Sequence, residues 1–404
     1  MITPATFRER RNRVRAMLGD AVLLIEGGVE GIRGDLRGGF FQDPNFAWLS
    51  GWLQPGAALL LAPKDEKDRL GDILFLPDQD KERTLWAGPL RDAGSPGIRA
   101  ASGFASVQRM AKLEDAVATA LRRYPRILCL SGSDTEERLR KQFPFREVSP
   151  ADSILARLRM KKSAEEIQAI RKAVSITIAG QKRAWQSLQQ SSYEYEVVAD
   201  ITHEFLRLGA ERHSFAPIIA GGKNACVLHY SRNRDPLQKG ALAVVDIGAE
   251  HAGYCGDLTR TIPIRSRFTA RQRALYQAVL DVQKEVIAAV RPGASISRQI
   301  PGSLHHLAVS LFSKMRLRKG RKSLADAFPH GIGHHLGMEV HDPNDPLALL
   351  EPGMVITVEP GVYLPEEGIG IRIEENVLVT EQGCEVLSAA LPREIEEVEE
   401  ILGL

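Results

Sequence analysis

Residues 241–264 read ALAVVDIGAEHAGYCGDLTRTIPI. Two apolar runs flank a glycine-containing turn, a pattern typical of an antiparallel β-hairpin. A tight turn at His251 and Ala252 would place Asp246 directly opposite Asp257, with both side chains on one face and their Cβ atoms about 5 Å apart. Two facing carboxylates repel each other, so the hairpin predicts a cation or a shared proton between them.

Residues 354–380 contain a second hairpin of the same kind. Its apolar runs place Glu359 opposite Glu374 when the connecting loop is centred on residues 366–367. Pro360 has no N–H to donate, so we expect the strand to break or bulge directly after Glu359. The two hairpins together predict a cage of four carboxylates. The alternative is a set of unrelated surface acids, but the run before the first acid of each pair is apolar enough for a buried strand, and buried carboxylates without cations are costly.

Four of the ten histidines lie between the hairpins, within residues 329–343. His330 and His334 have the i, i+4 spacing of a zinc-binding HExxH helix, but two intervening glycines and the absence of Glu after His330 favour a loop or a strand. Carboxylate oxygens with one imidazole suit Mn, Co, Zn or Fe(II). Two such ions bridged by shared carboxylates would orient a substrate and generate hydroxide near neutral pH.

The remaining motifs are less specific. His229 ends an apolar run, and this pattern fits a histidine buried in the core and a histidine in a functional site equally well. His305 and His306 fall in a helical pattern, which predicts a half-exposed helix face. The chain has no GxxxxGK[ST] phosphate loop, no GxSxG nucleophile elbow and no GxGxxG fingerprint after a strand, which argues against the nucleotide-binding and serine-hydrolase chemistries that use them.

The composition is that of an ordinary soluble chain. The 404 residues predict two domains, and 44% hydrophobic with 26% charged residues argues against disorder. A formal net charge of +2 provides no field for nucleic acid or an anionic membrane. Four scattered cysteines, no signal-peptide pattern and no apolar run of bilayer length predict a cytoplasmic protein. The basic segment 8–13 favours a solvated amphipathic helix over an anchor on an anionic surface.

The chain changes character near residue 150. Before it, short apolar runs alternate with helical patterns, which predicts an N-terminal α/β domain with strands at residues 57–62, 73–76 and 127–130. After it, a capping box from Ser163 to Glu166 begins a long helix that we expect to end near residue 190. The two hairpins are separated by helices expected at residues 270–290 and 303–314, an order that hints at an internal duplication of an α+β unit.

Several blocks, in this order, resemble the pita-bread metallopeptidases of family M24, and among them the branch of Xaa-Pro aminopeptidases (aminopeptidase P) and Xaa-Pro dipeptidases (prolidases). The blocks are GYCGDLTRT at 253–261 after Asp246, HGIGH at 330–334, VEPG at 358–361 and IRIE at 371–374. Residues 39–52 and 387–399 are similar to the N-terminal domain and the C-terminal tail of that branch. The resemblance implies an aminopeptidase P-type N-terminal domain at 1–155 and a pita-bread catalytic domain at 156–404 with internal pseudo-twofold symmetry.

The resemblance also implies a dinuclear metal centre. Its ligands would be Asp246, Asp257, His334, Glu359 and Glu374. Asp257 and Glu374 would bridge two divalent ions, usually Mn, with Co, Zn or Fe as alternatives. His229, His330 and His341 would surround the substrate. Arg372 would lie beside the substrate or brace the carboxylates.

The implied activity is hydrolysis of the Xaa-Pro bond at the N-terminus of peptides by a metal-bridging hydroxide. His229 or His341 would stabilise the oxyanion, and Glu359 would pass a proton to the leaving proline nitrogen. The expected partners are peptides with proline at the second position and further copies of the chain in a dimer or tetramer, with no nucleic acid and no membrane. The N-terminal domain would shape the cleft or contact another copy.

Two other functions remain open from the sequence. A prolidase needs an anchor for the substrate carboxylate, and residues 342–351 lack the arginine that some prolidases place there, which favours the aminopeptidase. A non-catalytic pita-bread binding module, or a metal-free relative such as creatinase, normally loses metal ligands, whereas this chain has all five.

Overall fold

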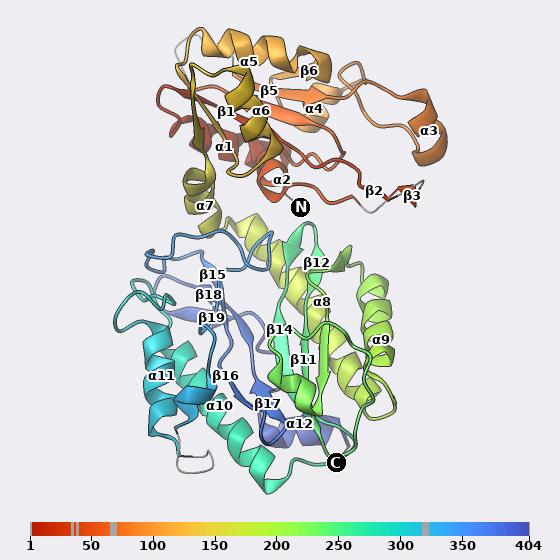
Figure 1. Ribbon diagram of the computed structural model, residues 1–404, viewed down its shortest axis with the longest axis vertical. Coiled ribbons are helices and arrows are strands. Elements are labelled where there is room, and N and C mark those ends of the chain that lie inside the picture. The colour runs from red at the N-terminus through yellow and green to blue at the C-terminus, as the bar shows by residue number, and fades with distance from the viewer. Residues whose placement is uncertain (1, 34–35, 38–39, 65–70, 317–322, 404) are drawn as a thin grey trace. The chain divides into compact units, whose positions relative to one another are not determined.

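A computed structural model describes residues 2–33, 36–37, 40–64, 71–316 and 323–403 (Figure 1). The chain divides into two compact units, Ile2–Leu158 and Arg159–Leu404. Gly39, which begins the stretch similar to the N-terminal domain of aminopeptidase P, lies outside the described residues. Among the described helices, none is long and apolar enough to cross a membrane.

The N-terminal unit is built on a mixed six-stranded sheet in the order β6-β5-β4-β1-β7-β8. Its strands are β1 (Ala21–Glu26), β4 (Ala58–Leu61), β5 (Asp72–Leu76), β6 (Ser106–Arg109), β7 (Arg126–Cys129) and β8 (Glu147–Pro150). The short strands β2 (Ile32–Arg33) and β3 (Leu36–Arg37) pair separately. The predicted strands are confirmed as β4, β5 and β7. The inner strands β4 and β5 are buried along their length, and side chains from β1, β4, β5 and β7 form much of the core cluster.

Short helices connect these strands, as expected for an α/β domain. They are α1 (Pro4–Arg15), α2 (Pro44–Ser50), α3 (Lys81–Ala87), α4 (Ile98–Ser102), the 3-10 helix η1 (Met110–Lys112), α5 (Leu113–Leu121) and α6 (Asp134–Gln142). Helix α7 (Asp152–Met160) follows the last strand and ends just inside the second unit.

The predicted helix is confirmed as α1, with Arg8 and Arg13 exposed, but the prediction that its basic side chains are all solvated is wrong. Arg10, Arg11 and Arg15 are buried, with exposed fractions of 5% or less. The Arg11 guanidinium bonds the Asp72 carboxylate at 2.6 Å and two backbone carbonyls, and it lies over the Phe104 ring. Charge alone indicated solvent exposure, but arginine has five donors and a planar face, so it can be buried where carbonyls and an aromatic ring surround it.

The C-terminal unit consists of two halves with the same order of elements, two helices followed by a β-hairpin. The first half contains α8 (Ala164–Leu188), α9 (Glu194–Arg207), β9 (Arg212–His213), β10 (Ile218–Gly221), the 3-10 helix η2 (Gly222–Cys226), β11 (Leu242–Ile247), β12 (Ala249–His251), β13 (Tyr254–Cys255) and β14 (Leu258–Pro263). The second contains α10 (Ala270–Ala288), α11 (Leu304–Lys314), η4 (Leu324–Ala327), β15 (Val355–Val358), β16 (Gly361–Leu364), β17 (Ile369–Arg372), β18 (Glu375–Val379) and β19 (Cys384–Val386). Helix α12 (Ile395–Ile401) follows. Figure 1 shows α8 beside the green strands of the first half and α10 beside the blue strands of the second.

The register of the first hairpin differs from the prediction. Asp246 pairs with Thr259, not with Asp257, because the turn lies at Ala252 and Gly253, one residue further along the chain than expected. Both turn residues have positive φ, 52° and 74°, as a two-residue hairpin turn requires. Asp257 is therefore a diagonal neighbour of Asp246, displaced by two residues along the same face.

The second hairpin has the predicted register. Val358 pairs with Glu375 and Gly361 with Arg372, so Glu359 and Glu374 lie at matching positions between these pairs. The strand breaks at Pro360, as expected from its missing N–H.

Each hairpin passes from one sheet to another halfway along its length. Strands β11 and β14 belong to a sheet with β10, whereas β12 and β13 belong to a sheet in which β12 pairs with β9. Likewise β15 and β18 belong to a sheet in which β18 pairs with β19, whereas β16 and β17 form a separate ladder. The crossing in the first hairpin depends on glycine, because a Cβ on Gly248 would lie 2.0 Å from the carbonyl oxygen of Gly256. The four acidic residues lie at or next to the two crossings, where the backbone leaves the regular ladder.

The helix that carries His305 and His306 is only partly as predicted. His306 is exposed, but His305 is buried and packs against the ring of Phe328 with centroids 5.5 Å apart. Burial lowers the pKa of His305 to about 4, so this imidazole is neutral in the folded protein at neutral pH.

Candidate metal centre and active site

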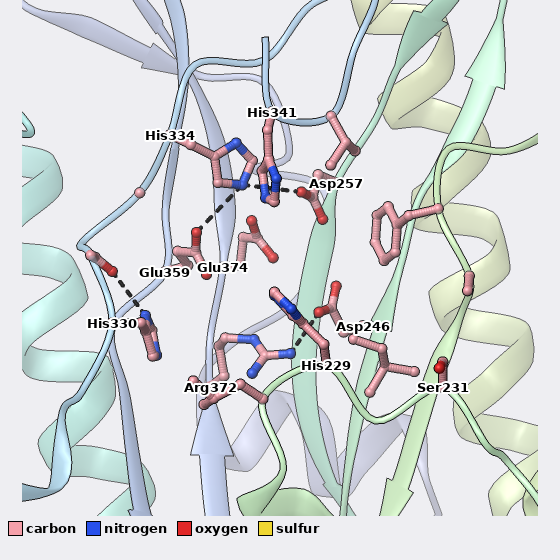
Figure 2. A pocket seen from close by; sticks show the side chains of 17 residues that line it. His229, Ser231, Asp246, Asp257, His330, His334, His341, Glu359, Arg372 and Glu374 are labelled. Atoms are coloured by element: carbon pink, nitrogen blue, oxygen red, sulfur yellow. Dashed lines mark hydrogen bonds and ion pairs between the residues drawn. The ribbon is translucent and has the colours of Figure 1, made fainter. Parts of the chain in front are cut away.

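A cavity of about 560 Å³ opens between the two hairpins of the C-terminal unit (Figure 2). All nine residues singled out in the sequence line it: His229, Asp246, Asp257, His330, His334, His341, Glu359, Arg372 and Glu374. The two aspartates come from the first hairpin and the two glutamates from the second, and the loop between β-hairpins supplies three of the histidines. This loop forms no helix at residues 329–342, in agreement with the reading of the HGIGH segment.

Three predicted ligands lie within reach of one small ion. Ligand atoms of Asp257, His334 and Glu374 are all within 4.8 Å of one another. Nε2 of His334 is 3.4 Å from Oδ2 of Asp257 and 3.4 Å from Oε1 of Glu359. Figure 2 shows Glu359 and Glu374 side by side, facing the space beneath His334 and Asp257.

The tautomer of His334 suits a metal ligand. Its Nδ1 lies 3.1 Å from the backbone oxygen of His335, an acceptor, so Nδ1 carries the proton and Nε2 faces the carboxylates. Without a metal ion, burial lowers the pKa of His334, but the hydrogen bond to Asp257 and the charges of Glu359 and Asp257 outweigh it and raise the pKa to about 9. A proton on Nε2 then occupies the position that a cation would take.

The protein groups around the buried carboxylates supply too little positive charge to balance them. Burial and the nearby carboxylates together raise the pKa of Asp257 to about 7, although His334 opposes them, and burial and the nearby carboxylates raise the pKa of Glu374 well above its usual range. Burial also raises the pKa of Glu359, although His334 and Arg372 oppose it. Oδ1 of Asp246 and Oε1 of Glu374 are buried without a hydrogen-bond partner among the described residues. Unsatisfied buried carboxylate oxygens around an imidazole lone pair fit divalent metal ions.

Arg372 braces the side of the centre away from His334. Its Nη2 donates to Oδ2 of Asp246 at 2.6 Å, and its Nη1 donates to the hydroxyl of Tyr363 at 2.9 Å. Figure 2 shows the guanidinium aimed at Asp246. The pKa of Arg372 is raised above its usual value, because the nearby tyrosine and carboxylates outweigh burial, so the guanidinium stays charged. The contacts of Arg372 are those of the bracing role.

His330 lines the cavity, yet both of its ring nitrogens are engaged within the protein. Nδ1 lies 2.8 Å from the backbone oxygen of Gly331, and Nε2 lies 2.9 Å from the hydroxyl of Tyr363. Burial, followed by the charge of Arg372, lowers the pKa of His330 to about 3, so the ring is neutral. Nδ1 therefore donates to Gly331, and Nε2 accepts from Tyr363.

His229 and His341 differ from His330. Their ring nitrogens make no hydrogen bond within the described part of the chain, and both rings border the cavity. The His341 ring packs edge-on against His334 with centroids 4.4 Å apart. Burial, followed by the charges of His334 and His229, lowers the pKa of His341, which favours its neutral form.

The sequence reasoning missed the apolar wall of the cavity and several supporting groups. The wall consists of Phe215, Ala216, Ile218, Leu228 and Val340. Leu228 and Val340 could have been found as neighbours of His229 and His341, whereas Phe215 carries no signal. The supporting groups include Thr259, whose hydroxyl donates to Oε2 of Glu374 at 2.7 Å.

The loop that carries His334 and His341 is fixed by a buried charge cluster. The Asp342 carboxylate accepts from Arg159 at 2.7 Å and from Lys162 at 3.1 Å, and all three side chains are 1% exposed. Burial opposes the two cations, but their charges hold the pKa of Asp342 below its usual range. Because breaking a buried ion pair leaves an uncompensated charge, this cluster strongly favours one conformation of the loop.

The family follows from comparison with known proteins. Residues 168–381 match the model of metallopeptidase family M24, and residues 7–128 match that of the aminopeptidase P N-terminal domain. The chain belongs to metallopeptidase family M24. It has the two-domain fold of aminopeptidase P, an N-terminal domain followed by a pita-bread domain, and the family implies divalent metal ions in the latter.

Relatives in this family are similar over nearly their whole length. The chain is 35% identical to the Xaa-Pro aminopeptidase of Haemophilus influenzae, over 98% of this chain and 97% of that protein. It is 33% identical to the Xaa-Pro aminopeptidase of Escherichia coli, over 98% and 96%. The solved structure of Escherichia coli aminopeptidase P with the inhibitor Pro-Leu has a TM-score of 0.88 at 30% identity, covering 100% of this chain and 99% of that one. Pseudomonas aeruginosa aminopeptidase PepP has a TM-score of 0.90 at 28% identity, with coverage of 100% and 99%.

Proposed function

We propose that this chain is an Xaa-Pro aminopeptidase, a metal-dependent exopeptidase that hydrolyses the first peptide bond of peptides with proline at the second position. One observation carries the proposal. Two hairpins bring four carboxylates and one imidazole to a buried cavity, in a chain whose full-length relatives are Xaa-Pro aminopeptidases. The proposal retains the domain division at 1–155 and 156–404.

Asp246, Asp257, His334, Glu359 and Glu374 would hold two divalent ions, with Asp257 and Glu374 shared between them. We favour Mn, with Co, Zn or Fe as alternatives. Bound there, such ions would supply a hydroxide near neutral pH and polarise the scissile carbonyl. The carboxylate cluster would also attract the free α-amine of the substrate, which limits cleavage to the first residue.

Glu359 would move the proton during hydrolysis. Burial raises its pKa, so its carboxylate can take a proton from the attacking water. When the water oxygen has bonded to the carbonyl carbon and the C–N bond breaks, this proton passes to the proline nitrogen, which leaves as a secondary amine. His229 or His341 would donate a hydrogen bond to the oxyanion, since both rings border the cavity and neither is hydrogen-bonded to another residue that the structure describes.

The remaining groups would position the substrate and the centre. The apolar wall that includes Phe215, Leu228 and Val340 offers a surface for the proline ring. Arg372 would hold Asp246 in place, and His330 would act through Tyr363 and Arg372 rather than by direct proton transfer. We further propose assembly into a dimer or tetramer and a cytoplasmic location.

Turnover of Xaa-Pro-Yaa-Yaa peptides and of Xaa-Pro dipeptides by the Mn-loaded protein tests the substrate class. We expect release of the first residue from the longer peptides. Cleavage of dipeptides alone would show a prolidase instead.

Asp257→Asn and Glu374→Gln should each lower kcat by at least about 100-fold, because each removes a charge that two ions would share. Glu381→Gln, at an exposed acid, is the matched control. Wild-type activity in either site variant would refute the shared-ligand assignment.

A further inference from the structure

We propose that Gln181 and Gln283 are a matched pair of positioning residues, each of which fixes the backbone of one hairpin beside its metal-binding carboxylates. The proposal rests on the metal centre of the proposed function and adds two residues that do not border the cavity. Both side chains are completely buried, with an exposed fraction of 0%.

Gln181 lies on α8 and joins the two strands of the first hairpin. Its Nε2 donates to the carbonyl oxygen of Val245 at 3.0 Å and to that of Leu258 at 2.6 Å. Val245 precedes Asp246 in the chain, and Leu258 follows Asp257. One amide group therefore ties together the two backbone segments that carry the aspartates.

Gln283 lies on α10 and makes the corresponding contacts in the second hairpin. Its Nε2 donates to the carbonyl oxygen of Ile373 at 2.7 Å and, more weakly, to that of Val358 at 3.4 Å. These residues immediately precede Glu374 and Glu359. The two halves of the unit thus use the same residue type, from the helix beside each hairpin, for the same backbone contact.

The orientation of both amides is fixed by a second hydrogen bond. Oε1 of Gln181 accepts from the indole N–H of Trp185 at 3.1 Å, and Oε1 of Gln283 accepts from Nη1 of Arg393 at 3.2 Å. Because the oxygen is occupied in this way, the NH₂ group must face the two carbonyls.

The amides lie beside the point at which each hairpin leaves one sheet for another. In the first hairpin, Val245 and Leu258 belong to the last pairs of the β11–β14 ladder, which ends at Ile247 and Leu258. In the second, Val358 belongs to the last pair of the β15–β18 ladder and Ile373 lies between the two ladders, so each amide spans the strands where a regular ladder ends. Metal coordination tolerates errors of only about 0.2 Å in ligand distance. A buried amide that spans both strands at the crossing would keep the facing carboxylates at the separation that two bridged ions require. The competing role is structural only, in which the amides satisfy buried carbonyls and contribute stability to the fold.

Manganese binding to metal-stripped protein separates these two roles. Gln181→Met and Gln283→Met keep the shape and burial of the side chain but remove both donors. We expect each variant to bind Mn²⁺ about tenfold more weakly by isothermal titration calorimetry. We also expect the electron paramagnetic resonance signal of the magnetically coupled ion pair to weaken at a metal concentration that saturates the wild type.

Gln189→Met is the matched control. Gln189 follows α8 and its Nε2 donates to the carbonyl oxygens of Trp185 at 3.4 Å and of Pro263 at 3.2 Å, at the end of β14 away from Asp257. This variant should bind Mn²⁺ with wild-type affinity, although it too loses strand contacts.

Wild-type Mn²⁺ affinity in either Gln181→Met or Gln283→Met would overturn the proposal that the two glutamines are matched positioning residues. So would an equal loss of affinity in Gln189→Met, or failure of the metal-stripped variants to fold, since both results assign the amides to the fold alone. None of these measurements uses a peptide. If the wild type bound two ions but cleaved no Xaa-Pro peptide, the proposed function would fail while this inference stood.

Discussion

At the residue scale, hydrogen bonding distinguishes histidines that the sequence presents as one cluster. His334 uses Nδ1 on a backbone oxygen and keeps Nε2 for the carboxylates. His330 uses both nitrogens within the protein. The ring nitrogens of His341 make no such contact among the described residues. Three imidazoles within twelve residues therefore have three different chemical capacities.

Replacement of His341 and His330 by leucine should have opposite signatures. His341→Leu should lower kcat by about 100-fold, the typical effect of losing one oxyanion donor, with an unchanged melting temperature. His330→Leu should lower kcat by less than about tenfold but lower the melting temperature, because the buried Tyr363 hydroxyl loses its acceptor. Peptide kinetics and thermal melts of both variants provide the measurement. A larger loss of activity in His330→Leu than in His341→Leu would contradict the assignment.

At the element scale, the two-residue periodicity of strands explains how the site could be found despite an error. The predicted partner of Asp246 was displaced by two residues from the observed one, Thr259. An even displacement keeps a side chain on the same face, so Asp246 and Asp257 still point the same way. In the second hairpin Pro360 marks the strand break in the sequence itself, and the register was predicted correctly.

Other features of the elements were out of reach of pattern reasoning, because they depend on tertiary partners. A charged helix such as α1 is expected to be solvated, and Arg11 can be buried because distant segments contribute the Asp72 carboxylate, two backbone carbonyls and the Phe104 ring. Gln181 and Gln283 resemble any polar residue in a long helix until the strands beside them are known. The loops that supply Phe215 and Val340 to the cavity likewise lack the regular apolar pattern from which a helix or a strand is predicted.

Helix α9 fixes the segment that carries His229 through one buried side chain. The Glu194 carboxylate is 0% exposed and accepts four hydrogen bonds, from the backbone N–H groups of Gly221 and Asp235 and from the side chains of Asn224 and Tyr230. All four donors lie within residues 221–235, on either side of His229. This carboxylate therefore controls the position of a predicted oxyanion donor from outside the cavity.

Glu194→Gln should loosen this segment. The amide offers an NH₂ group where two donors need an acceptor, so we expect a loss of about 1–3 kcal/mol in the free energy of unfolding. The kcat should fall, and metal content should stay at the wild-type level because no predicted ligand lies in the segment. Glu196→Gln on the same helix is the control, because it makes the same change of side chain at a capping residue whose backbone N–H donors the amide oxygen can still accept. Denaturant melts, kinetics and metal analysis provide the test, and wild-type kcat in Glu194→Gln would contradict it.

At the scale of the whole molecule, the metal centre links stability to pH. In the metal-free protein the folded-state pKa of Asp257 is raised from 3.8 to about 7, and that of Glu374 is raised as well. A group with a raised pKa contributes stability below its unfolded value, and this contribution is lost as the pH rises through the folded value. His334, with a pKa raised from 6.5 to about 9, acts in the same direction. All three groups therefore destabilise the metal-free fold as the pH rises.

The stabilisation by Mn²⁺ should consequently increase with pH. Bound ions favour the deprotonated ligands, so the Mn-loaded protein does not lose stability as the pH rises. In the metal-free protein the loss in the free energy of unfolding is about 1.4 kcal/mol for each group and each pH unit between its unfolded and folded pKa values. We expect the difference in melting temperature between Mn-loaded and metal-stripped protein to grow from pH 6 to pH 8. Histidines with lowered pKa values, such as His305, destabilise both forms equally in acid and cancel in this difference. Glu374→Gln should show a smaller and flatter difference, because it lacks one titrating ligand. A wild-type difference that stays constant or shrinks over this range would contradict the link between the buried carboxylates and the ions.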